Sequence, residues 1–164
     1  MSKRRHAQSL DDLPTPEVLR SMSGLEWLQK SMTGEVAAAP ISALMGFDLV
    51  EVSSGRVVFR GTPEFEAANP MGVTHGGWYG AILDSAMALA IQSKVPPGKA
   101  STTLEFKINI IRPIRPGIPA DAVGIAAHVG RTTGVASAEL RGVDDGKLYA
   151  TGSTTCQVFD VPDT

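Results

Sequence analysis

The segment from Gly76 to Gln92 constrains the fold most, because its apolar residues occupy every face of a helix. These residues are Trp78, Ala81, Ile82, Leu83, Ala86, Met87, Ala88, Leu89, Ala90 and Ile91. A helix that is apolar all round is buried rather than amphipathic. The segment carries one formal charge, the carboxylate of Asp84. A buried carboxylate is costly unless something compensates it, so Asp84 needs a structural or chemical reason.

Glycines line one face of the same predicted helix. Gly76, Gly77 and Gly80 precede Asp84 by eight, seven and four residues, so all four fall on roughly one face. A face without side chains lets another group approach the backbone closely. At the helix start, free backbone N–H groups and the positive end of the helix dipole can hold an oxygen that gains negative charge. Close packing of the helix or of two subunits is the alternative explanation.

Patterns on either side of this helix predict the remaining elements. Thr15 and Pro16 predict the start of a helix that runs to about residue 32, and residues 41–45 predict one helical turn. We expect strands over residues 47–53, 56–62, 102–110, 118–129, 133–143 and 147–159. The strand at 102–110 alternates most regularly, with Phe106 and Ile110 on one face and Thr103 on the other.

Composition is that of an ordinary soluble domain. The chain has 164 residues, of which 43% are hydrophobic and 20% charged. A formal net charge of −2 gives no reason to expect nucleic acid or an anionic membrane as a partner. We interpret residues 1–14, with the basic cluster Lys3–His6, as a frayed, solvated arm. The sequence shows no secretory signal, no membrane-spanning stretch and a single cysteine, Cys156, so we expect a cytoplasmic protein.

Long strands and a shorter buried helix predict a curled sheet. The last four strands would reach about 30–40 Å, which is longer than a helix of about 17 residues. An apolar helix beside one antiparallel sheet is buried best if the sheet curls around it. Such a sheet keeps a free edge or face, which predicts self-association. We therefore expect an α+β domain at residues 41–164, a long central helix wrapped by a curved antiparallel sheet, after an N-terminal arm and helix at residues 1–40.

The run Asn-Pro-Met-Gly-Val-Thr-His-Gly-Gly at 69–77, followed by Asp84 nine residues after His75, resembles the hotdog-fold thioesterases of the phenylacetate-pathway (PaaI-like) branch. The strand that ends in Arg112-Pro113 is similar to theirs as well. The resemblance covers about residues 40–160. It implies a hotdog fold, a homodimer or dimer of dimers (a homotetramer), no cofactor, and hydrolysis of acyl-CoA or acyl-carrier thioesters to free acid and thiol.

The resemblance also implies roles for individual residues. Gly76 would donate its backbone N–H to the thioester carbonyl, and Asn69 would polarise or place that carbonyl. Asp84, supplied across the dimer interface, would activate water or attack directly. His75 would mainly shape the loop and the site.

Further residues are expected around the substrate. In relatives a serine or threonine on the following strand orients the water, and Thr102 and Thr103 both fall at about that place. Arg112 and Arg115, held in a proline-rich turn, are positioned to contact the phosphates of coenzyme A, although solvated loop arginines are the commoner case. Trp78-Tyr79 is expected at the acyl pocket or the dimer interface, with core packing as the alternative.

Each assignment has a structural alternative. Asp84 could be a carboxylate satisfied by neighbouring hydroxyls or amides, and Asn69 could hold the turn before Pro70. His75 could be a loop residue held by hydrogen bonds. Gly77 is expected to contact the substrate, and packing is the alternative for it too.

Several other functions fit the sequence less well. The histidines are scattered without metal-ligand spacing, so we expect no metal. No serine lies in a Gly-x-Ser-x-Gly sequence, and Cys156 is expected in the core rather than as a nucleophile. A hotdog dehydratase or hydratase would usually pair its acid with a histidine in a different arrangement. A non-catalytic acyl-CoA sensor stays possible, but about 40 N-terminal residues leave little room for a DNA-binding helix-turn-helix.

Overall fold

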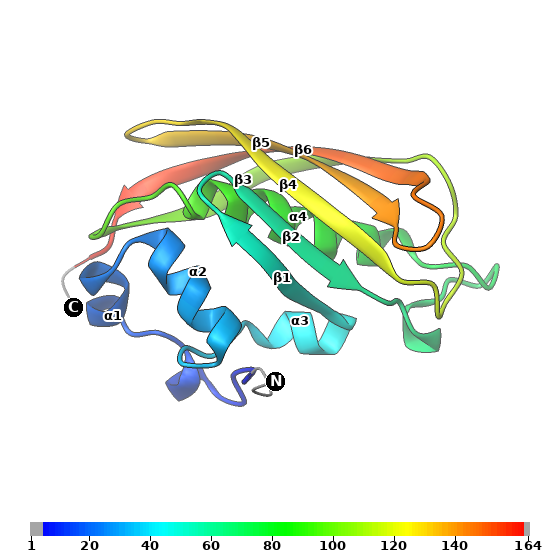
Figure 1. The fold of residues 1–164 in the computed structure, drawn as a ribbon, viewed down its shortest axis with the longest axis horizontal. Coiled ribbons are helices and arrows are strands. Elements are labelled where there is room, and N and C mark those ends of the chain that lie inside the picture. The colour runs from blue at the N-terminus through cyan, green and yellow to red at the C-terminus, as the bar shows by residue number, and fades with distance from the viewer. Residues whose placement is uncertain (1–4, 163–164) are drawn as a thin grey trace.

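A six-stranded antiparallel sheet and one long helix form the centre of the computed structural model, which describes residues 5–162. The strands are β1 (Phe47–Ser53), β2 (Arg56–Gly61), β3 (Lys99–Ile110), β4 (Ala120–Val129), β5 (Thr133–Gly142) and β6 (Leu148–Asp160). Their order is β1-β2-β4-β5-β6-β3, so β1 and β3 are the two edges. Helix α4 (Gly76–Gln92) packs along one face of the sheet (Figure 1). This arrangement confirms the predicted α+β hotdog fold.

The N-terminal part forms short helices: the 3-10 turn η1 (Leu10–Asp12), α1 (Pro16–Ser21), α2 (Gly24–Thr33) and α3 (Pro40–Met45), and a second 3-10 turn, η2 (Phe65–Ala67), precedes α4. Helices α2 and α3 lie over β1 and α4, whereas α1 contacts β3. The single helix predicted over residues 15–32 is wrong. Met22 has an extended backbone, and the Ser23 hydroxyl accepts a hydrogen bond from Glu26 N at 3.2 Å, which starts a new helix.

The prediction of a frayed N-terminal arm is also wrong for the residues that the structure describes. The backbone N–H of Ala7 donates to Ala38 O at 2.9 Å, and Ala7 is only 4% exposed. His6 Nε2 lies 3.2 Å from Asp48 Oδ1 on β1. Backbone pairing and burial therefore tie this polar segment to the rest of the domain. Lys3–Arg4, from the predicted basic cluster, lie outside the described residues.

Strand β3 contains a bulge that changes which residues face α4. The pairing of β3 with β6 shifts between Thr103 and Glu105, so Leu104 has no partner on β6. Thr103 consequently lies on the same face as Phe106 and Ile110, and our prediction that it lies on the opposite face is wrong. The reason is that one extra residue in a strand reverses the alternation of its side chains.

Small residues on the sheet allow it to lie close to α4. A Cβ added to Gly124 on β4 would meet the Ala86 carbonyl oxygen of α4 at 2.1 Å, and one added to Gly134 on β5 would meet Ile91 Cγ2 at 2.5 Å. The largest α4 side chains are 2% exposed or less: Trp78, Tyr79, Ile82, Leu83, Met87 and Ile91. Among residues 5–162, no helix combines the length and the apolarity needed to cross a membrane.

We expect Gly124→Ala to lower the free energy of unfolding by about 1–3 kcal/mol. The added methyl group would overlap backbone atoms of α4, which cannot move aside as a flexible side chain can. Urea denaturation measures this change. Gly130→Ala is the matched control, because its Cβ would approach the exposed ring of His128, at 2.9 Å, and that ring can shift. The control is expected to stay within about 0.5 kcal/mol of wild type. Equal stability of the two variants would contradict the close contact of β4 with α4.

Candidate active site

Burial and one hydroxyl group determine the ionisation of Asp84 on α4. Its Oδ1 accepts a hydrogen bond from Thr103 Oγ1 on β3 at 2.9 Å. Burial raises the pKa of the Asp84 carboxyl above its usual value, and the hydrogen bond from Thr103 lowers it in part. Thr103 Oγ1 also lies 3.9 Å from Sγ of the buried Cys156. A carboxylate with a raised pKa and a fixed orientation is suited to accept a proton from water.

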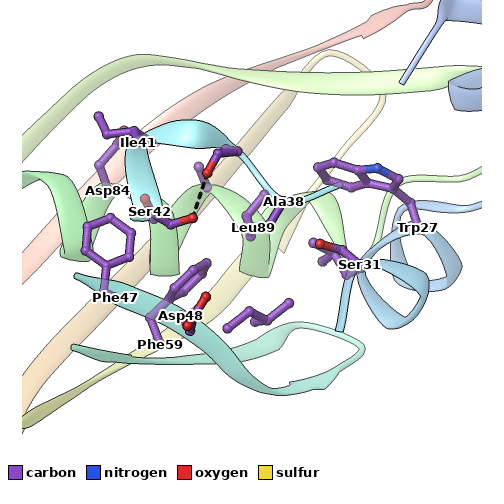
Figure 2. Close-up of a pocket in the computed structure, with 15 residues that line it drawn as sticks. Trp27, Ser31, Ala38, Ile41, Ser42, Phe47, Asp48, Phe59, Asp84 and Leu89 are labelled. Carbon is purple, nitrogen blue, oxygen red and sulfur yellow. Dashed lines mark hydrogen bonds between the residues drawn. The ribbon is translucent and has the colours of Figure 1, made fainter. Parts of the chain in front are cut away.

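The face of α4 that carries Asp84 is turned toward the N-terminal helices. Asp84, Ser85, Ala88 and Leu89 follow helical spacing and line a cavity of about 230 Å³ beneath α2 and α3. Apolar side chains from the other elements complete most of the wall, among them Leu28, Ile41, Phe47, Leu49 and Phe59. Figure 2 shows Asp84 at one end of this cavity and Trp27 at the other. The carboxylate therefore lies at the end of an apolar chamber.

His75 caps the start of α4. Its Nδ1 accepts a hydrogen bond from Gly77 N at 2.9 Å, and its own backbone N–H donates to Ala67 O at 2.8 Å. The Gly77 N–H is therefore already occupied, which makes the N–H of Gly76 the candidate donor at the helix start. Gly76 lines a second hollow, of about 280 Å³. His75 itself is exposed.

The Asn69 side chain holds the loop before α4. Its Oδ1 accepts hydrogen bonds from Met71 N at 2.9 Å and from Val73 N at 3.4 Å. The turn-forming role that the sequence left open for Asn69 is thus present. Asn69 also lines the same hollow as Gly76. Its oxygen can shape the loop while its amide nitrogen donates to a ligand oxygen.

Tyr79 has a positioning role that the sequence did not reveal. Its hydroxyl accepts a hydrogen bond from Ile114 N at 2.7 Å and donates one to Arg112 O at 3.3 Å. Burial raises the pKa of Tyr79, so the hydroxyl keeps the proton that it donates. Tyr79 thereby fixes the turn that brings Arg112 to the hollow lined by Gly76 and Asn69. An aromatic residue in an apolar helix resembles core, so no sequence signal distinguished this role.

Three predicted site residues lie away from both the cavity that Asp84 lines and the hollow that Gly76 lines. Thr102 is exposed and pairs with the exposed Gln157, because neighbours on a strand point to opposite faces. Trp78 is 2% exposed and its Nε1 donates to Met45 O at 2.8 Å, so it belongs to the core. Arg115 lines a separate hollow near the β5–β6 turn. Within residues 5–162, no group of three His, Cys, Asp or Glu side chains is arranged to hold a metal ion.

Within one chain, the Gly76 N–H and the Asp84 carboxylate lie far apart. Gly76 and Asp84 are eight residues apart on α4, which is about 12 Å along the helix axis. A carbonyl held by the Gly76 N–H would therefore lie far from Asp84 of the same chain. Edge strand β3 exposes large apolar side chains: Leu104 at 61%, Phe106 at 45% and Ile110 at 46%. Ile110 lies beside Gly76, and Phe106 lies beside Gly80. An apolar sheet edge of this kind is typical of a surface covered by another chain.

Comparisons with known proteins point to the thioesterase superfamily. The model of the thioesterase superfamily matches residues 71–149. A conserved protein from Pseudomonas aeruginosa is 34% identical with a TM-score of 0.69, and the match covers 74% of this chain and 95% of that one. A variant of the phenylacetic acid degradation protein PaaI from Thermus thermophilus is 25% identical with a TM-score of 0.66, covering 72% and 97%. A thioesterase family protein from Silicibacter pomeroyi is 27% identical with a TM-score of 0.69, covering 74% and 90%.

Among curated proteins, no sequence gives a significant match. The segment matched by the family model nevertheless contains the helix cap at His75, the candidate donor Gly76, Asp84 and Thr103. The fold, this segment and the similar structures agree with one another. The chain belongs to the thioesterase superfamily, in the PaaI-like hotdog branch.

Proposed function

We propose that the protein is an acyl-CoA thioesterase in which Asp84 activates the attacking water. The observation that carries this proposal is the Asp84 carboxylate, half-buried at the end of a mainly apolar cavity and oriented by Thr103 at 2.9 Å. Hydrolysis of a thioester needs a base, a donor for the carbonyl oxygen and room for an acyl group. The chain offers a candidate for each of the three, and this reaction requires no bound metal.

The proposed chemistry uses one water molecule. The Asp84 carboxylate accepts a proton as the water oxygen attacks the thioester carbonyl carbon. Negative charge then develops on the carbonyl oxygen, where the Gly76 N–H and the Asn69 amide can stabilise it. The tetrahedral intermediate collapses with cleavage of the C–S bond, and the thiolate takes the proton. The products are a free acid and a free thiol.

Geometry supports a site shared between two chains. Because Gly76 and Asp84 lie about 12 Å apart along α4, a carbonyl at Gly76 would need Asp84 from another protomer. The apolar edge of β3 beside Gly76 supplies a surface for that contact. In an isologous dimer, each of two identical sites would combine Gly76 and Asn69 of one protomer with Asp84 of its partner.

Coenzyme A is the thiol carrier that we propose for this protein. A protein of the same fold from Streptococcus mutans was crystallised with acetyl-CoA. In the present chain, Arg112 lies at the hollow of Gly76, and its Nη1 donates to Leu148 O at 2.5 Å. A guanidinium fixed in this way is suited to contact a phosphate oxygen at the mouth of the site.

Asp84→Asn is expected to lower kcat by about 10²–10⁴-fold, because an amide cannot accept the proton from water. The variant should fold and keep its oligomeric state, since burial already disfavours the charged carboxylate. Release of free thiol from acetyl-, octanoyl-, hexadecanoyl-, phenylacetyl- and benzoyl-CoA measures the change. Asp144→Asn, at an exposed turn, is the matched control. Full activity of Asp84→Asn would remove Asp84 from the mechanism.

The pH profile tests the contact between Thr103 and Asp84. The carboxylate acts only when ionised, so activity falls as pH drops through its raised pKa. Thr103→Val removes the hydrogen bond that lowers this pKa, so the acidic half of the kcat/KM profile should move to higher pH. Thr102→Val, on the exposed outer face, should leave the profile in place. A shift in the Thr102 variant but not in the Thr103 variant would reverse the assignment.

Mixing two defective variants tests whether the site is shared. Asn69→Asp keeps an oxygen for the loop but removes the amide donor, and Asp84→Asn removes the base. Each variant alone should be weakly active. After complete subunit exchange, half of the dimers carry one intact site, so about a quarter of all sites should recover. No recovery, with exchange verified by mass spectrometry, would show that both residues act within one chain.

A further inference from the structure

We infer that the cavity beneath α2 and α3 holds the acyl group of the substrate and selects uncharged acyl chains of medium length. This inference rests on the proposed thioesterase function and adds the substrate class to it. The feature that carries it is the position of Asp84 at one end of an otherwise mainly apolar cavity. A carbonyl placed at Asp84 would direct its acyl tail along this cavity.

The path of the tail follows one face of α4. Ser85, Ala88 and Leu89 continue from Asp84 toward α2 at helical spacing. Figure 2 shows Leu89 between Asp84 at one end and Trp27 at the other, with Phe47 and Phe59 on the opposite side. The cavity is therefore elongated along the helix, as a slim chain requires.

The volume of the cavity limits the length of the chain. About 230 Å³ is available, which is roughly the space of seven or eight groups the size of a water molecule. Acyl groups with about six to ten carbons would fill this space. A hexadecanoyl group would not fit within it.

Helix α2, which lines the Trp27 end of the cavity, is anchored to the end of α4. Gly24 N of α2 donates to Val95 O at 2.9 Å, and a Cβ on Gly24 would meet the Gln92 carbonyl oxygen at 1.8 Å. Leu28, in the next turn of α2, is 1% exposed and lines the cavity. Such close backbone contact fixes α2 as a wall rather than a mobile flap.

The charges of the wall disfavour an acyl group that ends in a carboxylate. The ionisable side chains that line the cavity are Asp48 and Asp84, and the lining contains no lysine or arginine. Asp48 contacts His6 at 3.2 Å on the outer side of the wall. A buried carboxylate on the substrate would have no cation to pair with in this cavity.

Kinetics with a series of straight-chain acyl-CoAs from two to sixteen carbons, plus succinyl-CoA, test this inference. We expect kcat/KM of wild type to rise about two- to fourfold per methylene, to reach its maximum at six to ten carbons, and to fall for longer chains. Succinyl-CoA should be turned over more slowly than the uncharged butanoyl-CoA, which has the same number of carbons.

Two substitutions at the end lined by α2 should move the optimum in opposite directions. Ser31→Leu places a larger side chain where the buried Ser31 lines the cavity, so the ratio of octanoyl- to butanoyl-CoA turnover should fall about tenfold. Trp27→Ala removes the ring at that end, so the ratio of dodecanoyl- to octanoyl-CoA turnover should rise about tenfold. Gln29→Leu adds the same side chain on the exposed face of α2 and is the matched control.

The outcomes separate this inference from the proposed function. Shifts in opposite directions for Ser31→Leu and Trp27→Ala, with the control unchanged, support it, and circular dichroism verifies that each variant is folded. An identical chain-length profile in all four proteins, or a wild-type optimum at sixteen carbons, would overturn the inference while the thioesterase function stands. Absence of turnover with every thioester would instead contradict the proposed function.

Discussion

The burial of α4 is the constraint on which the rest of the structure depends. An apolar helix can be covered on most of its surface only if the sheet lies very close to it, and Gly124 and Gly134 provide that closeness. Over the face that carries Asp84, Ser85 and Ala88, strands β1 and β2 form only part of the wall of a cavity, and α2 and α3 complete the enclosure. The same packing that stabilises the fold thus places a carboxylate in an apolar chamber.

The bulge in β3 connects this packing to chemistry. Without the unpaired Leu104, the strand could present either Thr103 or the row of Phe106 and Ile110 to α4, but not both. With the bulge, Thr103 orients Asp84 while the apolar row lies beside the glycines at the helix start. The raised pKa of Asp84 reflects a balance between burial, which favours the neutral acid, and this single hydrogen bond.

The length of α4 explains why association belongs to the proposed function. The groups suited to hold a carbonyl oxygen lie at the N-terminal end of the helix, and Asp84 lies about two turns further along. A second chain across the apolar edge of β3 offers a way to bring the two regions together. The sheet edge, the helix start and the carboxylate are then parts of one site rather than separate features.

The sequence by itself determined the order of the strands and the long helix and the unusual position of Asp84, because these depend on local periodicity and on one charge in an apolar helix. Its resemblance to a known family indicated the hotdog fold. Only the tertiary structure showed that Thr103 rather than Thr102 contacts Asp84, since a bulge depends on the pairing of two strands about fifty residues apart. It also assigned Trp78 to the core and the Gly77 N–H to His75. The cavity beneath α2 and α3 was equally invisible in the sequence, because its walls come from segments whose contact no local pattern encodes.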